Sequence, residues 1–478
     1  MSVLDGYYPQ DVFRYFEEIC AIPHGSGNEE AIADYIERTA RAAGLSVYRD
    51  PYHNVLVSKR AKPGFEDFPA VLLQGHTDMV CEKDPDCTHD FERDPLKLRI
   101  QDGFVSAVGT TLGADDGIAV AMMLAVLTDP SLDHGPVECL FTVDEERNMT
   151  GAQNFDYSRI TARRVINLDS EAERECIVSC AGGTDIAYRF ANTYAHNVHP
   201  TAKITVSSLA GGHSGADIHL GLLNANTCMA SFLWEEYRIK PFQLISVDGG
   251  QRHNVITTEC TALISCDHID ELRTRAADFE RELRANCRQA DAGVRVRVDR
   301  KGVRERALGF RESARVLSAM VLAPTGVFCQ NEEGMPLASA NLGVVRTDEQ
   351  YVHLEYLLRF NAECYYRRYT EKYRLLADLL GCEMHTGGYY DCWEKNPHSA
   401  LARIYQDTFR KLYGGREARI STMHAGVECG MIRKGLGPEA DIISIGPDLF
   451  EIHTPRERGD LLSIGRTYGL LLKLLCAR

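Results

Sequence analysis

The sequence lacks the long hydrophobic runs that mark membrane proteins and secretory signals. No window approaches the roughly 18 consecutive apolar residues that a membrane-spanning helix needs. The N-terminal residues show no basic segment followed by an apolar stretch, as a secretory signal would. We therefore expect a cytoplasmic protein that makes no contact with a membrane.

Paired cysteine motifs are also missing. The 16 cysteines extend from Cys20 to Cys476, and none forms a Cys-x-x-Cys pair. Several, such as Cys139 and Cys266, lie inside apolar runs. In a large chain without a signal this pattern is typical of buried free thiols, so neither disulfides nor a cysteine-rich zinc site is expected.

Excess positive charge is the third feature that is missing. Lysine and arginine number 53 against 68 aspartate and glutamate residues, which gives a net charge of −15. Cationic runs are short, as at Arg367-Arg368, and stand among acidic residues. Because binding to a phosphate backbone is driven by clustered lysine and arginine, no nucleic-acid partner is expected.

The chain is long enough for two domains. Its 478 residues exceed the roughly 250 to 300 residues at which single hydrophobic cores stop growing. Apolar residues make up 44% and charged residues 25%, as in ordinary soluble proteins. Changes of pattern predict a larger domain built from residues 1–186 and 387–478, with a second domain inserted at 187–386.

The larger domain shows alternating strand and helix patterns, which predict an α/β fold with a mixed, mostly parallel sheet flanked by helices. A strongly apolar segment at 118–127 is long enough for a buried helix. The inserted domain reads as α+β, and its strand and helix pieces recur, which suggests an internal duplication. The strands expected in the larger domain's first part are 45–48, 55–58, 70–74, 137–143 and 164–168.

Five apolar runs end in acidic or histidine residues. The apolar run at 71–80 ends in His76 and Asp78, two residues apart, so both side chains can face one crevice. Strand ends of this kind converge where α/β sheets bind ligands. Histidine and carboxylate ligands without cysteine suit Zn²⁺, Mn²⁺ or Co²⁺, and a bridging carboxylate can hold two ions. The other runs end in Asp115, Glu145 with Glu146, Asp169 and His453.

Adjacent acidic residues suggest a division of roles. In an extended chain the side chains of Glu145 and Glu146 diverge, so they cannot easily serve one ion together. One can bind a metal while the other takes a proton from water. Taken alone, this stretch is better interpreted as two solvated glutamates.

Seven motifs resemble one family in the expected order along nearly the whole chain. The sequence is similar to the cytosolic aminoacyl-histidine dipeptidases, carnosinase-like members of the co-catalytic zinc aminoacylase and carboxypeptidase G group. The resemblance implies the fold of a di-zinc exopeptidase with an inserted lid domain. The motifs lie at 75–78 (GHTD), 111–117 (TLGADDG), 142–152 (TVDEERNMTGA), 167–170 (NLDS), 180–183 (CAGG), 211–215 (GGHSG) and 424–430 (HAGVECG).

The resemblance also implies two divalent ions, Zn²⁺ first, with Mn²⁺ or Co²⁺ as alternatives. Carried over by position, His76 and Asp169 would bind one ion. Glu146 and His453 would bind the other, and Asp115 would bridge the two.

Three further features of the larger domain follow from the same resemblance. Asp78 would orient the His76 ring, and Glu145 would be the general base. The peptide bond between Asp115 and Asp116 would be cis. Asp116 stands where close relatives often carry asparagine, and we expect it to point away from the ions.

The resemblance also assigns substrate contacts, two of them, His213 and Asn254, in the inserted domain. His213 would reach across to the scissile carbonyl and stabilise the developing oxyanion. Asn254, His424 and Gly426 would contribute to substrate binding.

The resulting hypothesis is a metal-dependent dipeptidase. It would hydrolyse small peptides, preferentially Xaa-His dipeptides such as β-Ala-His or Gly-His, through a water activated by the metal, and a homodimer is possible. An amidohydrolase of N-acyl amino acids or a broader tripeptidase would keep the same site. A non-catalytic metal-binding protein on this fold is the remaining alternative.

Overall fold

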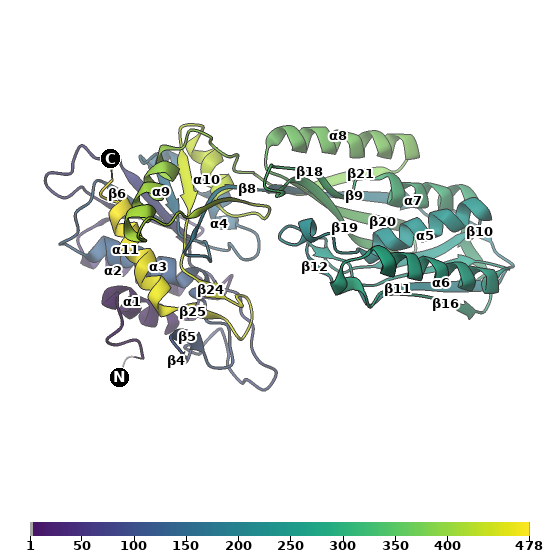
Figure 1. Ribbon diagram of the computed structural model, residues 1–478, viewed down its shortest axis with the longest axis horizontal. Helices are drawn as coiled ribbons and strands as arrows, with labels where there is room; N and C mark the ends of the chain where they lie inside the picture. The colour runs from purple at the N-terminus through teal and green to yellow at the C-terminus, as the bar shows by residue number, and fades with distance from the viewer. Residues whose placement is uncertain (1–2, 478) are drawn as a thin grey trace. The chain divides into compact units, whose positions relative to one another are not determined.

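A sheet assembled from both ends of the chain forms the centre of one of two compact units (Figure 1). The structure is a computed structural model and describes residues 3–477. Unit 1 consists of Met1–Cys180, Trp393–Thr422 and Val427–Arg478, and unit 2 of Ala181–Cys392 and Met423–Gly426. The domain boundaries expected at 187 and 386 stay a prediction, as does the internal duplication.

The sheet of unit 1 has a parallel centre. Among the described residues it contains eight strands, and β6, β3, β7 and β23 are neighbours that run parallel. The edge strand β1 pairs antiparallel with β2, and β2 pairs antiparallel with β6. The expected mixed sheet is therefore confirmed. In sheet order the strands are β1 (Ser46–Arg49), β2 (Val55–Lys59), β6 (Val137–Thr142), β3 (Val71–His76), β7 (Arg164–Asn167), β23 (Asp441–Ser444), β8 (Glu175–Cys180) and β22 (Arg419–Met423).

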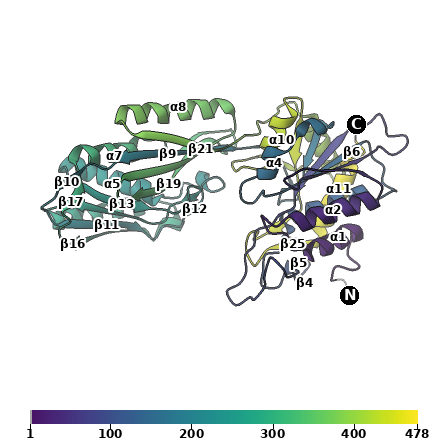
Figure 2. The same cartoon turned by 180° about the vertical axis from the view of Figure 1, so that it is seen from behind.

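The expected buried helix is α3 (Ala114–Thr128), which packs on β3. Every residue from 116 to 127 is buried, which explains why this helix has no polar face. The amphipathic helices α1 (Gln10–Cys20) and α2 (Glu30–Ala42) pack against it, and Figure 2 shows these two helices at the front of unit 1. This packing fixes the start of α3 beside the end of β3.

A second, smaller sheet lies within unit 1. The loop at 451–457 joins two of its strands, so His453 does not follow a strand of the main sheet. The apolar run that ends in His453 therefore contains β24 of this smaller sheet. The strands of this sheet, in order, are β24 (Leu449–Phe450), β25 (Arg458–Asp460), β5 (Phe104–Ala107) and β4 (Leu98–Gln101).

Unit 2 is an antiparallel sheet with helices packed on it, which confirms its α+β character. Its helices are α5 (Ala225–Ile239), α6 (Ile269–Asn286), α7 (Phe310–Leu322) and α8 (Glu363–Leu380). The main sheet strands are, in order, β16 (Arg295–Lys301), β11 (Thr201–Ser207), β15 (Cys260–Ser265), β13 (Leu244–Gly249), β19 (Pro336–Thr347), β20 (Tyr351–Phe360), β9 (Gly182–Ala191) and β21 (Glu383–Tyr390), with β18 (Gly326–Gln330) beside β19.

The structure also bears on the cysteines and on membrane-spanning helices. All 16 cysteines are free, as predicted, although Cys81 and Cys364 are exposed. Over the described residues, no helix combines the length and the apolar character needed to cross a bilayer.

Candidate metal centre

Three neighbouring strands deliver polar side chains to one edge of the sheet in unit 1. His76 is the last residue of β3, and Glu145 and Glu146 follow β6. Asp169 comes two residues after β7, on the other side of β3. Since β6, β3 and β7 run parallel, their carboxyl ends meet, as the sequence predicted.

The Asp115 carboxylate lies between the two histidines. Its Oδ1 is 3.2 Å from His76 Nε2, and its Oδ2 is 3.1 Å from His453 Nε2. Asp115 stands in the first turn of α3 with non-helical backbone angles. The bond between Asp115 and Asp116 is cis, as the family resemblance implied.

Each histidine also meets a second carboxylate. Asp169 Oδ1 is 3.6 Å from His76 Nε2, and Glu146 Oε1 is 2.9 Å from His453 Nε2. The structure therefore brings the five expected ligands together as two triads that share Asp115. Their role in binding metal stays a proposal.

Asp78 holds this cluster in two ways. Its backbone carbonyl is 2.9 Å from His76 Nδ1, closer than its carboxylate Oδ1 at 3.5 Å. The carboxylate instead accepts the backbone N–H groups of Glu145 (3.0 Å) and Glu146 (3.2 Å) and the Ser26 hydroxyl (2.8 Å). Asp78 thus fixes the His76 ring through its carbonyl and the Glu145-Glu146 backbone through its side chain.

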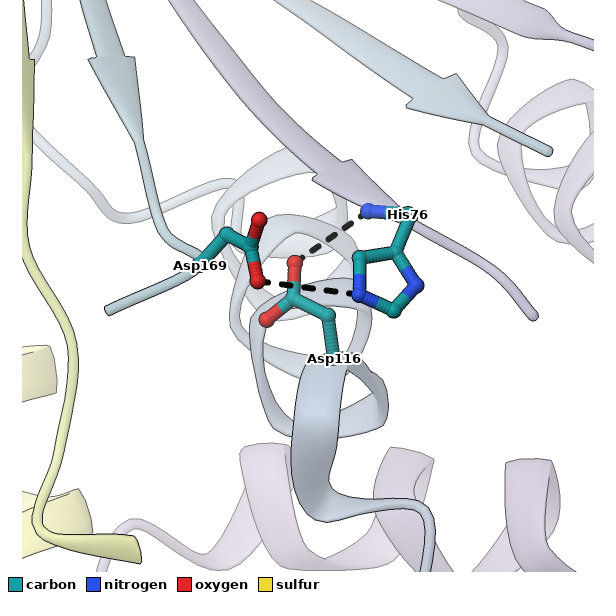
Figure 3. A group of neighbouring side chains, drawn as sticks. All are labelled: His76, Asp116 and Asp169. Atoms are coloured by element: carbon teal, nitrogen blue, oxygen red, sulfur yellow. Dashed lines mark hydrogen bonds and ion pairs between the residues drawn. The ribbon is translucent and has the colours of Figure 1, made fainter. Parts of the chain in front are cut away.

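Asp116 belongs to the cluster, and the expectation that it points away was wrong. Its Oδ2 accepts the backbone N–H of His76 at 3.2 Å, as Figure 3 shows. Its carboxylate also lies within 4.8 Å of ligand atoms of His76 and Asp169. Burial, with the nearby charge of Asp169, raises the pKa of Asp116 well above its usual value.

The electrostatics of the cluster suit bound cations. Burial opposes a charged His453 ring, but Asp115 and Glu146 raise its pKa to about 11. His76, only 1% exposed, likewise has its pKa raised against burial, by Asp115 and Asp169. In the absence of metal, protons on the two histidine rings therefore neutralise the negative charge of the carboxylates. Bound divalent ions would neutralise the same charge. Histidine and carboxylate donors without cysteine fit Zn²⁺, Mn²⁺ or Co²⁺.

Glu145 differs from the other acidic residues expected at the site, because its carboxylate makes no hydrogen bond or ion pair with His76 or His453 among the described residues. One of its carboxylate oxygens lies within 4.8 Å of ligand atoms of His76 and Glu146. Burial raises the pKa of its carboxyl well above the usual value, and the charges of Asp169 and Glu146 add to this effect. A carboxylate with a raised pKa is a stronger proton acceptor.

His213 lies in unit 2 beside a buried arginine. The backbone N–H of Ala216 donates to His213 Nδ1 at 3.0 Å, and Arg359 Nη2 lies 3.3 Å from Nε2. Burial and the charge of Arg359 lower the pKa of His213 to about 4, so the ring is neutral at pH 7. Both neighbours are hydrogen-bond donors, whereas the neutral ring has one acceptor nitrogen and one N–H donor, so these contacts do not fix which nitrogen carries the proton.

The other residues expected to bind substrate also belong to unit 2. His424 is 2% exposed, and its two ring nitrogens already contact Ser339 Oγ (2.7 Å) and Asn361 Oδ1 (2.8 Å). The Asn254 carbonyl accepts the N–H of Ser214, next to His213. A side chain at Gly426 would meet the Tyr390 ring at 2.6 Å. Their contacts with substrate stay predictions.

Three buried charged residues were not identified from the sequence as part of the site. Arg359 is 4% exposed, and its Nε has no hydrogen-bond partner among the described residues. A charged residue inside the apolar strand β20 was the signal that could have identified it. Glu428 and Glu457 gave no such signal, because the groups they bind lie hundreds of residues away in the sequence.

Comparison with known proteins gives consistent matches over the full chain. The model for the peptidase family M20/M25/M40 matches residues 72–477. The cytosol non-specific dipeptidase of Escherichia coli (strain K12) is 34% identical over 489 residues, which cover 99% of each chain. The crystal structure of aminoacylhistidine dipeptidase from Vibrio alginolyticus has a TM-score of 0.90 at 32% identity, covering 99% of this chain and 97% of that one. A tripeptidase from Staphylococcus aureus shares the fold, with a TM-score of 0.56 at 17% identity and 98% of both chains covered.

Proposed function

The chain belongs to the peptidase family M20/M25/M40, and we propose that it is a metal-dependent dipeptidase. The position of the Asp115 carboxylate supports this most directly. Its two oxygens face His76 and His453 at 3.2 and 3.1 Å, as a carboxylate shared by two ions requires. His76 and Asp169 would hold one ion, and Glu146 and His453 the other.

The chemistry divides between the ions and the side chains. Two bound divalent ions, Zn²⁺ first and Mn²⁺ or Co²⁺ as alternatives, would polarise the peptide carbonyl and make a water more acidic. Glu145 would take the proton of the attacking water and pass it to the leaving amine. The buried position that raises the pKa of Glu145 favours this role.

His213 is our proposed donor to the developing oxyanion. Its neutral ring has one N–H to donate, and the neighbouring Arg359 guanidinium supplies positive charge. A donor aimed at developing charge contributes about 3 to 4 kcal/mol to lowering the barrier. The partly unsatisfied Arg359 would also attract the free carboxylate of a dipeptide.

Our proposal also covers the preferred substrate, the cellular location and the oligomeric state. The names of the two nearly full-length relatives mention non-specific dipeptides and aminoacylhistidine, respectively. We propose that this chain cleaves dipeptides and prefers Xaa-His, with Asn254, His424 and Gly426 shaping the substrate site. We also propose a cytosolic location, which is the location in the Escherichia coli relative's name, and a homodimer.

A panel of four compounds tests this proposal. Metal-depleted protein is supplied with Zn²⁺ or Mn²⁺ and given Gly-His, β-Ala-His, Ala-Leu or N-acetyl-histidine, and the released amino acid is measured. Cleavage of the dipeptides without attack on the acetyl compound is the expected result. Turnover of the acetyl compound alone would make the protein an amidohydrolase, and no turnover with both ions bound would refute the enzymatic function.

A further inference from the structure

Glu457 satisfies the backbone at the start of α3 with one carboxylate. Its Oε2 accepts the N–H groups of Leu112 (2.8 Å) and Gly113 (3.1 Å), and its Oε1 accepts those of Ala114 (2.8 Å) and Asp115 (3.4 Å). The first N–H groups of a helix have no partner within the helix. A side chain that is 2% exposed therefore fixes the segment that carries Asp115.

The backbone of the same residue ends the loop that carries His453. The Glu457 N–H donates to the Thr454 carbonyl at 3.0 Å, and the Thr454 hydroxyl donates to the Glu451 carbonyl at 2.7 Å. Glu451 and His453 have φ angles of 51° and 59°. Non-glycine residues in this left-handed region cost about 1 to 2 kcal/mol each, so the loop keeps its shape only if its ends are held.

The two histidines differ in how much packing holds them. The His76 side chain is 1% exposed, whereas that of His453 is 44% exposed. Packing and the Asp78 carbonyl therefore hold His76, whereas packing holds the His453 side chain much less. Besides its direct contacts with Asp115 and Glu146, His453 is tied to the bridging carboxylate by the short path through Glu457 to the backbone of Asp115.

We propose that Glu457 is a positioning residue that sets the separation of His453 and Asp115. It would selectively strengthen binding of the ion held by Glu146 and His453, with little effect on the ion held by His76 and Asp169. This inference rests on the proposed function, because it takes those residues as the ligands.

The substitution Glu457→Gln tests the inference. It keeps the side chain's size but replaces one acceptor oxygen with an NH₂ group that faces two backbone N–H donors. Glu138→Gln is a matched control, because Glu138 is 6% exposed in unit 1 and accepts the N–H groups of Thr161 and Ala162 near the start of β6. Metal-depleted proteins are titrated with Mn²⁺, and binding is followed by calorimetry and by the electron paramagnetic resonance signal of coupled Mn²⁺ pairs.

We expect the substitution to weaken the binding of only one of the two ions. Wild type and Glu138→Gln should bind two ions and show the coupled signal. Glu457→Gln should bind one ion as wild type does and the other about 10- to 100-fold more weakly, the usual effect of losing an outer-shell partner. Wild-type affinity for both ions, or equal weakening of both, would overturn the proposal.

A second variant covers failure to fold. If Glu457→Gln does not accumulate as folded protein, Glu457→Asp keeps the charge with one methylene fewer and is judged by the same two outcomes. Two bound ions in the wild type with an unchanged Glu457→Gln would refute only the role of Glu457. Failure of the wild type to bind two ions would refute the proposed function itself.

Discussion

Among single residues, Asp115 and Asp116 are adjacent acids with different surroundings. Asp115 lies between His453 and His76, which lower its pKa against the effect of burial, so it is charged. Among the described residues, Asp116 accepts a hydrogen bond only from the His76 backbone N–H, and burial raises its pKa. The two residues should therefore respond differently to the same substitution.

Asp116→Asn is expected to change turnover of Gly-His by less than about tenfold and to leave two ions bound. A carboxyl group and a carboxamide have nearly the same shape, and both can accept from the His76 backbone N–H. Asp115→Asn, its matched control, should lower metal affinity and turnover by about a hundredfold or more. Metal analysis and steady-state kinetics measure both, and a large loss of bound metal in Asp116→Asn would make its charge essential.

Glu428 should make the stability of the metal-free protein depend on pH. Gln74 and Thr142 both donate to its Oε2, and its Oε1 has no partner in the described structure. Burial raises the pKa of Glu428 to about 8. The folded state therefore binds this proton between about pH 4.5 and 8, where the unfolded state has released it, so stability falls as pH rises.

In Glu428→Gln the fall in unfolding temperature across this window should be shallower than in wild type. The comparison uses metal-depleted protein, because bound ions would change the charges nearby. Differential scanning calorimetry at intervals from pH 5 to pH 8 measures both slopes. Parallel slopes for the two proteins would contradict the raised pKa.

At the scale of elements, the approach of β3 to α3 depends on Gly75. A Cβ at this position would lie 2.5 Å from Asp116 Oδ2 and 3.1 Å from Ala119 Cβ. The helix and strand can therefore bring Asp115 to His76 only when residue 75 has no side chain.

Gly75→Ala should cost about 1 to 3 kcal/mol of unfolding free energy, the usual range for overpacking, and should weaken metal binding. Gly469→Ala in the helix α11 (Leu461–Leu474) is the control, because a Cβ there meets nothing within 4 Å. That substitution should instead stabilise the helix, by up to about 1 kcal/mol. Urea unfolding and metal titration measure both variants, and unchanged metal binding in Gly75→Ala would contradict this account.

Strands and the residues at their ends could be predicted because both depend on local pattern. The apolar run that ends in His76 shows where a buried strand stops, whatever the rest of the chain does. The partners of Glu457 could not be predicted in this way, since its hydrogen bonds join residues more than 340 positions apart. The orientation of Asp116 likewise depends on the packing of α3 on β3, which the sequence pattern does not specify.

At the scale of the whole molecule, all the proposed ligands lie in unit 1. A ligand that binds only the folded form stabilises by RT ln(1 + [L]/Kd), about 2.7 kcal/mol at a hundred times Kd. Metal removal should therefore lower the unfolding temperature of unit 1 and leave that of unit 2 unchanged.

The two tryptophans of the chain allow this prediction to be measured separately for each unit. Trp393 belongs to unit 1 and Trp234 to unit 2. Thermal unfolding followed by fluorescence in Trp234→Phe reports unit 1, and in Trp393→Phe it reports unit 2. Equal shifts on adding chelator to both variants would show that the ions stabilise both units.

The adjacent pair Glu145 and Glu146 provides the most direct test of the dinuclear dipeptidase. Bound metal and turnover of Gly-His are measured together for Glu145→Ala and Glu146→Ala. We predict that Glu145→Ala keeps two ions while turnover falls by about 10² to 10⁴, the range for a lost general base. Glu146→Ala should lose one ion. Loss of metal from Glu145→Ala together with full metal content in Glu146→Ala would contradict the assignment of base and ligand.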